Sequence, residues 1–259
     1  MINKFMELME PAPLAIQFLE VSYRCYHRTI LTQINFSVNQ GDVLVLLGRS
    51  GSGKTTILKL INHLLKPTQG EVLVQGKLTT EWNAIQLRRQ IGYVIQEIGL
   101  FPHLTVAENV AVVPKLAGWK LDQIKIRVQE LLELVGLEFS YFGKRYPHQL
   151  SGGQRQRVGV ARALAADPPI LLMDEPFGAL DPLTRLELQQ EFKQLQQQLG
   201  KTVVFVTHDV QEAFLLASRI GLMQDGRLIE LDTPANFIKS QWPEAKAFLE
   251  CLSPRQFFA

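Results

Sequence analysis

The sequence predicts an α/β fold: a mostly parallel sheet flanked by helices, with an antiparallel β region before it and a helical region inserted into it. Apolar runs at residues 43–47, 170–173 and 203–206 have the length and composition of buried strands. Stretches with helical spacing lie between these runs, which is typical of a parallel sheet. Residues 97–166 change character, because helical spacing dominates there and strand signals are few.

The first strands are expected between residues 16 and 38, where apolar and polar residues alternate and β-branched and aromatic residues are frequent. This pattern is typical of half-buried antiparallel strands. Gly41 and Asp42 are a turn signal. A fully apolar strand, a glycine-rich loop and a helix that ends near Leu65 follow.

The inserted region is predicted to be helical. Residues 121–135 place apolar side chains three or four positions apart, as an amphipathic helix does. After the insertion, a helix over residues 183–199 separates two buried strands, so the insertion interrupts one domain instead of starting another. Two short strands at residues 221–223 and 227–230, split by an Asp-Gly turn, indicate a closing hairpin.

The composition limits the class of protein. The chain has 259 residues, of which 46% are hydrophobic, enough for the core of one large domain. The formal net charge of +2 gives no sign of nucleic acid as the main partner. Cys25 and Cys251 are too few for a disulfide framework or a zinc site, which favours a reducing compartment. No apolar stretch approaches the roughly 20 residues that span a bilayer, so we expect a soluble cytoplasmic chain.

The glycine-rich loop matches the phosphate-binding pattern G-x-x-x-x-G-K-[ST], directly after an apolar strand and directly before a helix. In such a loop, backbone N–H groups point at phosphate oxygens, the lysine reaches the β- and γ-phosphates, and the hydroxyl ligates Mg²⁺. A glycine-rich turn without a ligand is the alternative, but it does not require so many fixed positions. The residues expected to hold ATP are Gly48, Arg49, Ser50, Gly51, Ser52, Gly53, Lys54, Thr55 and Thr56.

Two adjacent carboxylates end the apolar strand at residues 170–173. A buried acid is costly unless it is paired or bound to a metal, so we expect Asp174 to face Mg²⁺, with a water molecule between them. Glu175 points the other way and is expected to act as general base for the attacking water. An acid that only caps the next turn is the alternative, which the neighbouring phosphate loop disfavours.

A second anion site is predicted at the start of another helix. Ser151 and Gln154 have the spacing of a capping box, in which each side chain bonds the other residue's backbone N–H. Gly152 and Gly153 expose the backbone at the positive end of the helix dipole. With Leu150, these residues form the sequence LSGGQ.

With these motifs the sequence resembles the ABC ATPase family, over nearly the whole chain and in the right order. The matching parts are the phosphate loop, Gln96, the LSGGQ signature, Asp174 with Glu175, the D-loop at residues 178–181, and His208. The resemblance implies a P-loop nucleotide hydrolase core with an antiparallel β subdomain and an inserted helical subdomain.

The expected domain limits follow from this resemblance. Residues 14–245 would form a single ABC ATPase domain, with the catalytic core at residues 16–96 and 167–245 and the helical subdomain at residues 97–166. Residues 246–259 would form a short tail without CBS domains.

The resemblance also implies a composite site, in which the signature of one subunit closes over the γ-phosphate held by the loop of the other. A dimer is therefore expected, most simply a homodimer. Gln96 would sense Mg²⁺ and the attacking water, His208 would hold the γ-phosphate, and Asp181 would communicate across the dimer. Hydrolysis is expected to proceed by in-line attack of water, stabilised by Lys54, Mg²⁺, the signature helix and His208.

One departure concerns the aromatic residue that the family stacks on adenine. Ungapped counting places Cys25 at that position, with Tyr26 adjacent and Tyr23 two positions before. We favour Tyr26 through a shift of one residue, and a core or surface tyrosine is the alternative.

Residues 87–114 are most similar to the osmoprotectant, or quaternary-amine, branch of importer ATPases, which handle glycine betaine, choline or carnitine. Residues 99–103 and 114–119 carry most of this resemblance. Another importer branch, for amino acids or sulfonates, is the alternative. A soluble ABC protein of DNA repair or translation usually joins two cassettes or inserts a long coiled coil, and neither is visible here.

We therefore expect an ATP-hydrolysing importer subunit, peripheral on the cytoplasmic face of the cell membrane. Its expected partners are integral membrane permease subunits and, indirectly, a substrate-binding protein, without nucleic acid.

Overall fold

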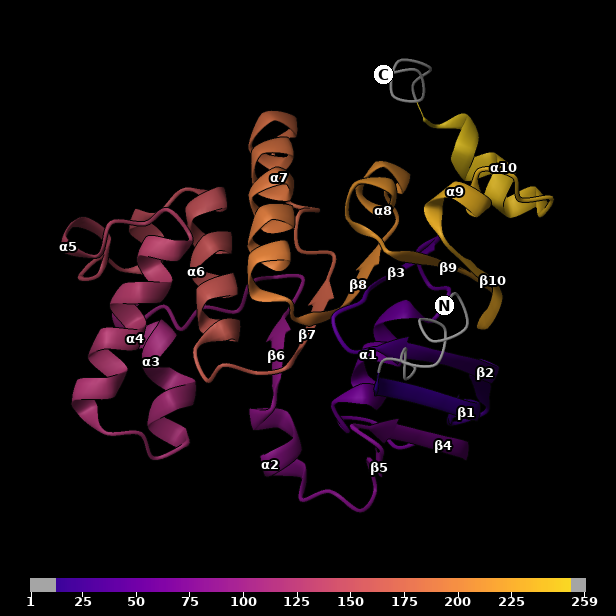
Figure 1. Ribbon diagram of the computed structural model, residues 1–259, viewed down its shortest axis with the longest axis horizontal. Coiled ribbons are helices and arrows are strands. Elements are labelled where there is room, and N and C mark those ends of the chain that lie inside the picture. Colours follow the sequence, from indigo (N-terminus) through magenta and orange to yellow (C-terminus); the bar gives the residue numbers. More distant parts are fainter. Residues whose placement is uncertain (1–12, 253–259) are drawn as a thin grey trace, which may run out of the picture.

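The computed structural model describes residues 13–252. Within these residues, the larger sheet has six strands in the order β10-β9-β3-β8-β7-β6 (Figure 1). The pairs β6–β7, β7–β8, β8–β3 and β3–β9 are parallel, and β9–β10 is antiparallel, which confirms the mostly parallel sheet. The strands are β3 (Val43–Gly48), β6 (Ile91–Val94), β7 (Ile170–Asp174), β8 (Thr202–Thr207), β9 (Arg219–Gln224) and β10 (Arg227–Asp232).

The central strands β3, β7 and β8 are buried along their whole length. Alternate residues of a strand face opposite sides of a sheet, and both sides are covered here. Leu46 and Val204 belong to one hydrophobic cluster, with α1 (Lys54–Ile61), while Val45 and Phe205 belong to the other, with α7 (Pro182–Leu199) and α8 (Val210–Leu216). Continuous apolar runs, rather than alternating ones, are therefore what these strands require.

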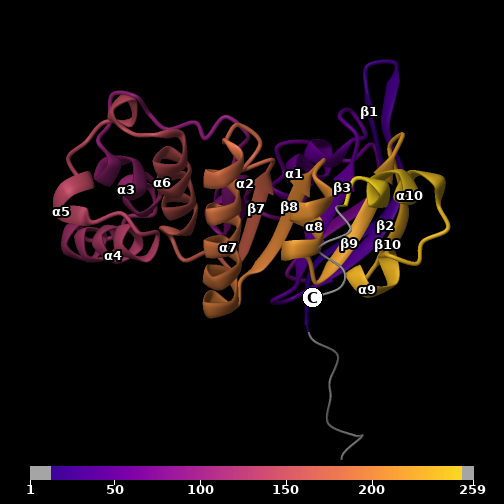
Figure 2. The ribbon, with the colours of Figure 1, turned by 90° about the horizontal axis from the view of Figure 1, so that it is seen from above.

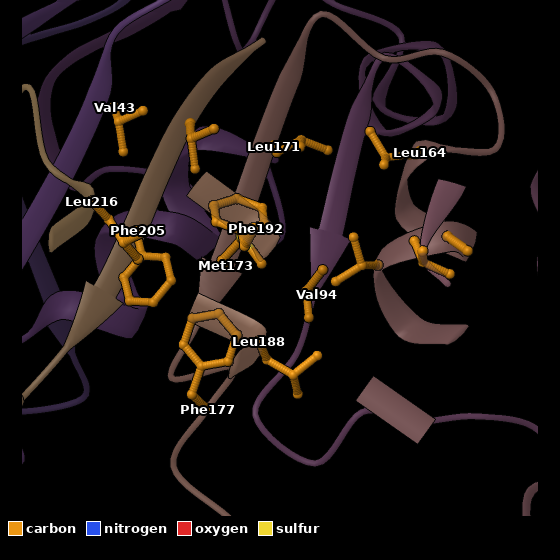
Figure 3. Packing of buried hydrophobic residues seen from close by; sticks show 14 of the residues in the cluster. Val43, Val94, Leu164, Leu171, Met173, Phe177, Leu188, Phe192, Phe205 and Leu216 are labelled. Atoms are coloured by element: carbon orange, nitrogen blue, oxygen red, sulfur yellow. The ribbon is translucent and has the colours of Figure 1, made fainter. Parts of the chain in front are cut away.

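Figure 3 shows the second of these clusters from close by. The Phe177 ring lies 5.7 Å from that of Phe205 on β8 and 6.4 Å from that of Phe192 on α7, between ring centroids. Fully burying a side chain of this size stabilises the fold by roughly 1.5–3 kcal/mol. The three rings pack the middle of α7 and the segment after β7 against the sheet.

The smaller sheet is antiparallel and has the order β2-β1-β4-β5. It confirms the predicted antiparallel subdomain. Phe18 and Phe36, from neighbouring strands, stack with ring centroids 4.5 Å apart in the cluster that also covers α1. The strands are β1 (Leu14–Cys25), β2 (Arg28–Asn39), β4 (Gln69–Val74) and β5 (Lys77–Leu78).

The inserted region is helical, as predicted, and it lies at the opposite end of the molecule from the smaller sheet (Figures 1 and 2). Its elements are α3 (Val106–Leu116), α4 (Leu121–Leu134), α5 (Phe139–Phe142), the 3₁₀ turn η1 (Pro147–Gln149) and α6 (Gly152–Leu164). The remaining helices are α2 (Ala84–Arg89), α9 (Pro234–Phe237) and α10 (Pro243–Glu250), of which α9 and α10 lie on the side of the smaller sheet.

The helix predicted at residues 183–199 is α7, and the predicted closing hairpin is β9 and β10. The domain limits remain predictions. The limit expected after residue 245 falls inside α10, and residues 253–259 of the expected tail lie outside the described part of the chain. None of the helices between residues 13 and 252 is long and apolar enough to cross a membrane.

Candidate active site

The phosphate loop connects β3 to α1. Its backbone depends on glycine, because Gly51 has φ 81° and Gly53, the N-cap of α1, has φ 102°. A Cβ on Gly51 would meet nothing within 4 Å, so the loop faces open space there. Ser52 Oγ is buried and has no hydrogen-bond partner. A loop with a free interior at the start of a helix suits an anionic ligand.

Lys54 lies across the loop. Its Nζ donates to Gly48 O at 2.8 Å and to Arg49 O at 3.0 Å. Burial lowers the pKa of Lys54, while the charges of Glu175 and Asp174 act in the opposite direction. Two backbone carbonyls thus hold the ammonium group within the loop.

Asp174 ends β7 and contacts α1. The Thr55 hydroxyl donates to Asp174 Oδ1 at 2.9 Å, and Tyr93 Oη lies 3.4 Å from Oδ2. Burial raises the pKa of Asp174, and the hydrogen bond from Thr55 offsets part of that effect. These contacts compensate for placing a carboxyl group in a buried strand.

The same residues fit Mg²⁺. No group of three or more His, Cys, Asp or Glu side chains in the described range could hold a metal ion by itself. Mg²⁺ does not need such a group, since it is usually bound by one or two protein ligands together with substrate phosphates. Thr55 and Asp174 offer two adjacent oxygens beside the phosphate loop, which is the donor set that such shared binding needs.

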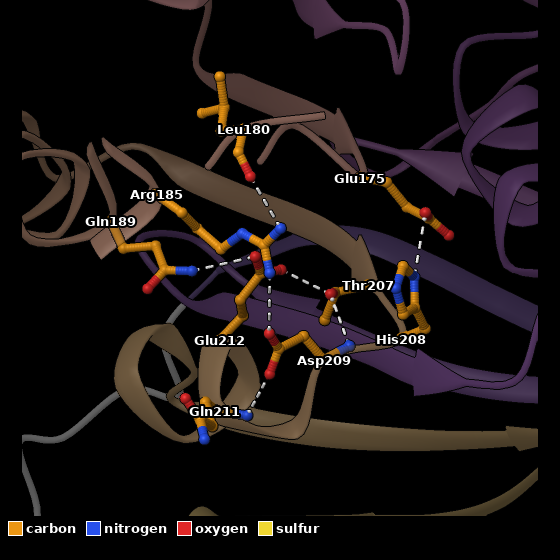
Figure 4. A network of polar contacts seen from close by, with 9 residues as sticks. All are labelled: Glu175, Leu180, Arg185, Gln189, Thr207, His208, Asp209, Gln211 and Glu212. Atoms are coloured by element: carbon orange, nitrogen blue, oxygen red, sulfur yellow. Dashed lines mark hydrogen bonds and ion pairs between the residues drawn. The ribbon is translucent and has the colours of Figure 1, made fainter. Parts of the chain in front are cut away.

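Glu175 and His208 face each other (Figure 4). Glu175 Oε2 lies 3.1 Å from His208 Nδ1, and the two side chains are 19% and 60% exposed. The Glu175 backbone has φ 45°, a conformation that is uncommon outside glycine, asparagine and aspartate. Its N–H donates to Val206 O at 3.0 Å. With this backbone, the carboxylate of Glu175 contacts His208.

A buried polar network supports the turn that carries His208 (Figure 4). The Thr207 hydroxyl donates to Glu212 Oε2 at 2.5 Å, and Gln189 Nε2 donates to Glu212 Oε1 at 3.0 Å. The Asp209 N–H donates to Thr207 Oγ1 at 2.9 Å. Burial raises the pKa of Glu212, and the hydrogen bond from Thr207 offsets part of the rise.

The same network reaches the D-loop. Arg185 on α7 donates to Leu180 O at 3.0 Å and lies 3.8 Å from Asp209 Oδ2. Asp181 is the N-cap of α7 and accepts a hydrogen bond from the Thr184 N–H, and its contacts with Thr184 lower its pKa. The D-loop and the turn of His208 are thus tied to one helix. Sequence reasoning missed Arg185, Gln189 and Glu212, because none belongs to a local motif.

The signature forms the predicted capping box. Ser151 is the N-cap of α6, where Ser151 Oγ accepts from the Gln154 N–H at 3.2 Å and the Ser151 N–H donates to Gln154 Oε1 at 3.0 Å. A Cβ on Gly153 would lie 2.7 Å from Thr184 Cγ2, so this glycine lets α6 approach α7 closely. The capping box orders the backbone at the start of α6, where Ser151 is exposed and Gly153 is buried against α7.

A cavity of about 830 Å³ is lined by some of the residues described above. Its size lies in the range of small-molecule sites. Of the residues predicted from the sequence, it is lined by Arg49, Ser50, Gly51, Gly53, Lys54, Thr55, Thr56, Gln96, Glu175 and His208. Gly48, Ser52 and Asp174 are not in its lining, although Gly48 and Asp174 contact residues that are.

The other predicted residues lie outside the cavity lining. Ser151, Gly152, Gly153 and Gln154 are absent from it, and so is Asp181. Tyr26 lies in the turn between β1 and β2, where it is 97% exposed, and it does not line the cavity either. The lining instead includes residues of β2 and α10 that sequence reasoning had not singled out.

The fold and the site together define a nucleotide-binding protein of the P-loop class with an inserted helical subdomain. A family model described as ABC transporter matches residues 31–178. The glycine betaine uptake system ATP-binding protein YehX of Escherichia coli is 49% identical over 223 residues, which are 86% of this chain and 72% of that protein. The chain therefore belongs to the ABC transporter family.

Other similar proteins support the same family assignment. The choline transport ATP-binding protein OpuBA of Bacillus subtilis is 50% identical over 210 residues, 81% of this chain and 55% of that protein. The chain thus spans about half the length of several curated relatives that it matches. Among solved structures, the ATP-binding cassette MJ0796, a dimer in a post-hydrolysis state bound to ADP and Pi, matches with a TM-score of 0.74 and 37% identity, covering 84% of this chain and 98% of that one.

Proposed function

We propose that this chain is the ATP-hydrolysing subunit of an ABC importer and that it works as a dimer. One observation carries the proposal: the cavity contains the phosphate loop, Glu175 and His208, whereas residues 151–154 lie outside its lining. One chain thus supplies two halves of a site that face different nucleotides. The dimeric cassette MJ0796, with ADP and Pi bound, supports this arrangement.

The proposed roles follow from the contacts of each side chain. Lys54 exchanges its bonds to Gly48 O and Arg49 O for bonds to phosphate oxygens. Glu175 accepts the proton of the attacking water, and His208, in contact with that carboxylate, donates to the γ-phosphate. Gln96 lines the same cavity and orients the water.

Thr55 and Asp174 would hold Mg²⁺ in this scheme. Bound there, the ion would supply positive charge against the negative charge that develops on the phosphates. The protein keeps the two oxygens in place through the hydrogen bond between Thr55 and Asp174.

The second half of the site comes from the partner. The start of α6, with Ser151, Gly152, Gly153 and Gln154, would contact the γ-phosphate bound by the other subunit, and Asp181 would lie at the boundary between the two. The capping box supports this role, because it orders the backbone N–H groups before a phosphate arrives. A preordered donor group loses little entropy on binding.

The proposed solute is a quaternary-ammonium osmoprotectant of the glycine betaine or choline type. The names of two relatives support it: choline transport for OpuBA and glycine betaine uptake for YehX. A separate permease in the membrane would carry the solute, with this chain bound peripherally on the cytoplasmic side. The stacking of Tyr26 on adenine also remains a proposal, supported by the exposure of its ring.

Two measurements test this function. First, the purified chain should hydrolyse ATP in the presence of Mg²⁺, and Lys54→Ala should abolish that activity. Second, cells that depend on this chain and its permease for growth at high osmolarity should take up labelled glycine betaine or choline, and Lys54→Ala should stop the uptake. Uptake of amino acids in place of quaternary amines would contradict the solute. Hydrolysis unaffected by Lys54→Ala would contradict the site.

A further inference from the structure

Helix α10 is held against the phosphate loop by an ion pair. Arg49 Nε donates to Glu244 Oε1 at 2.7 Å, and Arg49 Nη2 donates to Oε2 at 3.3 Å, across 195 positions of sequence. Glu244, in the first turn of α10, is only 12% exposed, whereas Arg49 is 72% exposed. Two parallel hydrogen bonds of this kind fix orientation as well as distance. The loop and the helix are therefore joined as one unit.

The same helix closes one side of the nucleotide cavity. Ala245 is fully buried and Leu252, just after the helix, is nearly so, and both belong to the main hydrophobic cluster. Ala247, Phe248 and Cys251 line the cavity. Cys251, the C-cap of α10, follows Phe248 by three positions and Ala247 by four, so it lies on the same side of the helix as both.

The residues that line the cavity fall into three groups of different chemistry. The phosphate loop occupies one part, and Gln96, Glu175 and His208 surround the place where the γ-phosphate reacts. Arg28 and Ile30 of β2, together with the α10 face, make up the rest. A nucleotide whose phosphates occupy the loop must extend its ribose and base into the remaining space. Apart from Arg28, that space is bounded by apolar side chains and the Cys251 thiol, which suits a flat base.

We propose that α10 forms a wall of the nucleotide-binding site, and that Ala247, Phe248 and Cys251 contact the ribose or base of bound ATP. The proposal rests on the proposed ATP binding and goes beyond it, since the helix lies outside the motifs that hold the phosphates. The pair of Arg49 and Glu244 sets the distance between the wall and the loop.

The cysteines allow a direct test. The sequence has two, Cys25 and Cys251, and both are exposed. In the Cys25→Ser variant, alkylation by N-ethylmaleimide therefore reports on Cys251 alone. The rate is measured without ligand, with ATP and no Mg²⁺, with ADP, and with inorganic tripolyphosphate. At a concentration of ten times the Kd, a ligand that covers the thiol slows alkylation by about tenfold.

We expect ATP and ADP to slow alkylation of Cys251 and tripolyphosphate to leave it unchanged, because tripolyphosphate fills the loop but has no ribose or base. Equal protection by ATP, ADP and tripolyphosphate would overturn the proposal. Occupation of the phosphate loop alone would then be enough to protect Cys251. ATP binding without protection of Cys251 would also overturn the proposal. A fluorescent analogue measures that binding. Failure of ATP to bind at all would instead overturn the proposed function.

A matched control lies on the same helix. Lys246 is exposed and does not line the cavity. In the chain carrying Cys25→Ser, Cys251→Ser and Lys246→Cys, the single thiol should be alkylated at the same rate with and without ATP. Protection of this thiol as well would point to dimerisation or a rearrangement of the whole helix, which contradicts direct contact.

A substitution that fills the cavity gives a second readout. Ala247→Trp should weaken ATP binding and leave tripolyphosphate binding unchanged, whereas Lys246→Trp should affect neither. Unchanged ATP affinity in Ala247→Trp would count against α10 as a wall.

Discussion

Glu175 and His208 lie 33 positions apart, and Glu175 Oε2 is 3.1 Å from His208 Nδ1. The parallel pairing of β7 with β8 brings the ends of the two strands together, and the N–H of Glu175 donates to Val206 O. The contact therefore arises from sheet register and a left-handed backbone at Glu175. It places the carboxylate that we propose as general base beside the imidazole that we propose as a donor to phosphate.

The first prediction concerns the general base. Glu175→Gln keeps the shape of the side chain but cannot accept the proton of water, so hydrolysis should fall by about 10²–10⁴-fold. ATP affinity should be retained, because the phosphate loop is untouched. Steady-state hydrolysis and equilibrium binding of ATP check this pair of expectations. Undiminished hydrolysis would refute the role of Glu175.

The second prediction concerns the buried network behind His208. Gln189→Leu removes a donor to the buried Glu212 carboxyl group, which should lower the free energy of unfolding by about 1–3 kcal/mol. Gln190→Leu is the matched control, since Gln190 is the exposed neighbour on the same helix and should change stability by no more than about 0.5 kcal/mol. Chemical denaturation measures both. Equal stability of the two variants would contradict the assigned contact.

The third prediction concerns pH. Burial raises the pKa of Glu212 above its ordinary value of 4.5, so the native state binds more protons than the unfolded chain between the two pKa values. The contribution of Glu212 to the free energy of unfolding therefore falls as the pH rises through that interval. Relative to wild type, Glu212→Gln should gain stability as the pH rises from below 4.5 to neutrality. A difference in unfolding free energy that does not vary with pH would show that Glu212 is not the cause.

The fourth prediction separates two tyrosines. Tyr26→Ala should lower ATP affinity without affecting stability, because the Tyr26 ring is almost fully exposed in a turn. Tyr23→Ala should lower stability and leave ATP affinity unchanged, because Tyr23 packs against the cluster of the smaller sheet. Nucleotide titration of both variants measures the ATP affinity, and thermal unfolding measures the stability. Unaltered affinity in Tyr26→Ala would remove Tyr26 from the adenine site.

Local motifs explain why much of the site could be predicted from the sequence. The capping box joins Ser151 and Gln154, three positions apart, and the phosphate loop lies within one turn between a strand and a helix. Their geometry depends on neighbouring residues alone. The buried strands could also be predicted from the sequence, because a sheet covered on both faces requires continuous apolar runs.

The rest of the site depends on distant pairs that no local pattern records. Arg49 and Glu244 meet across 195 positions, and Gln189 and Glu212 across 23. A glutamate or glutamine on a helix is ordinarily an exposed residue, so nothing in the sequence marks Glu212 or Gln189 as buried. The limit expected after residue 245 falls inside α10, and no local pattern records the contact of this helix with Arg49 either.

The central claim is that one nucleotide is held between the loop of one subunit and the signature helix of another. Light scattering on Glu175→Gln with saturating ATP and Mg²⁺ tests it most directly, with Ser151→Arg added in a second sample to block the signature. We predict twice the monomer mass for Glu175→Gln and the monomer mass for the double variant. A monomer that retains bound ATP in both samples would contradict the claim.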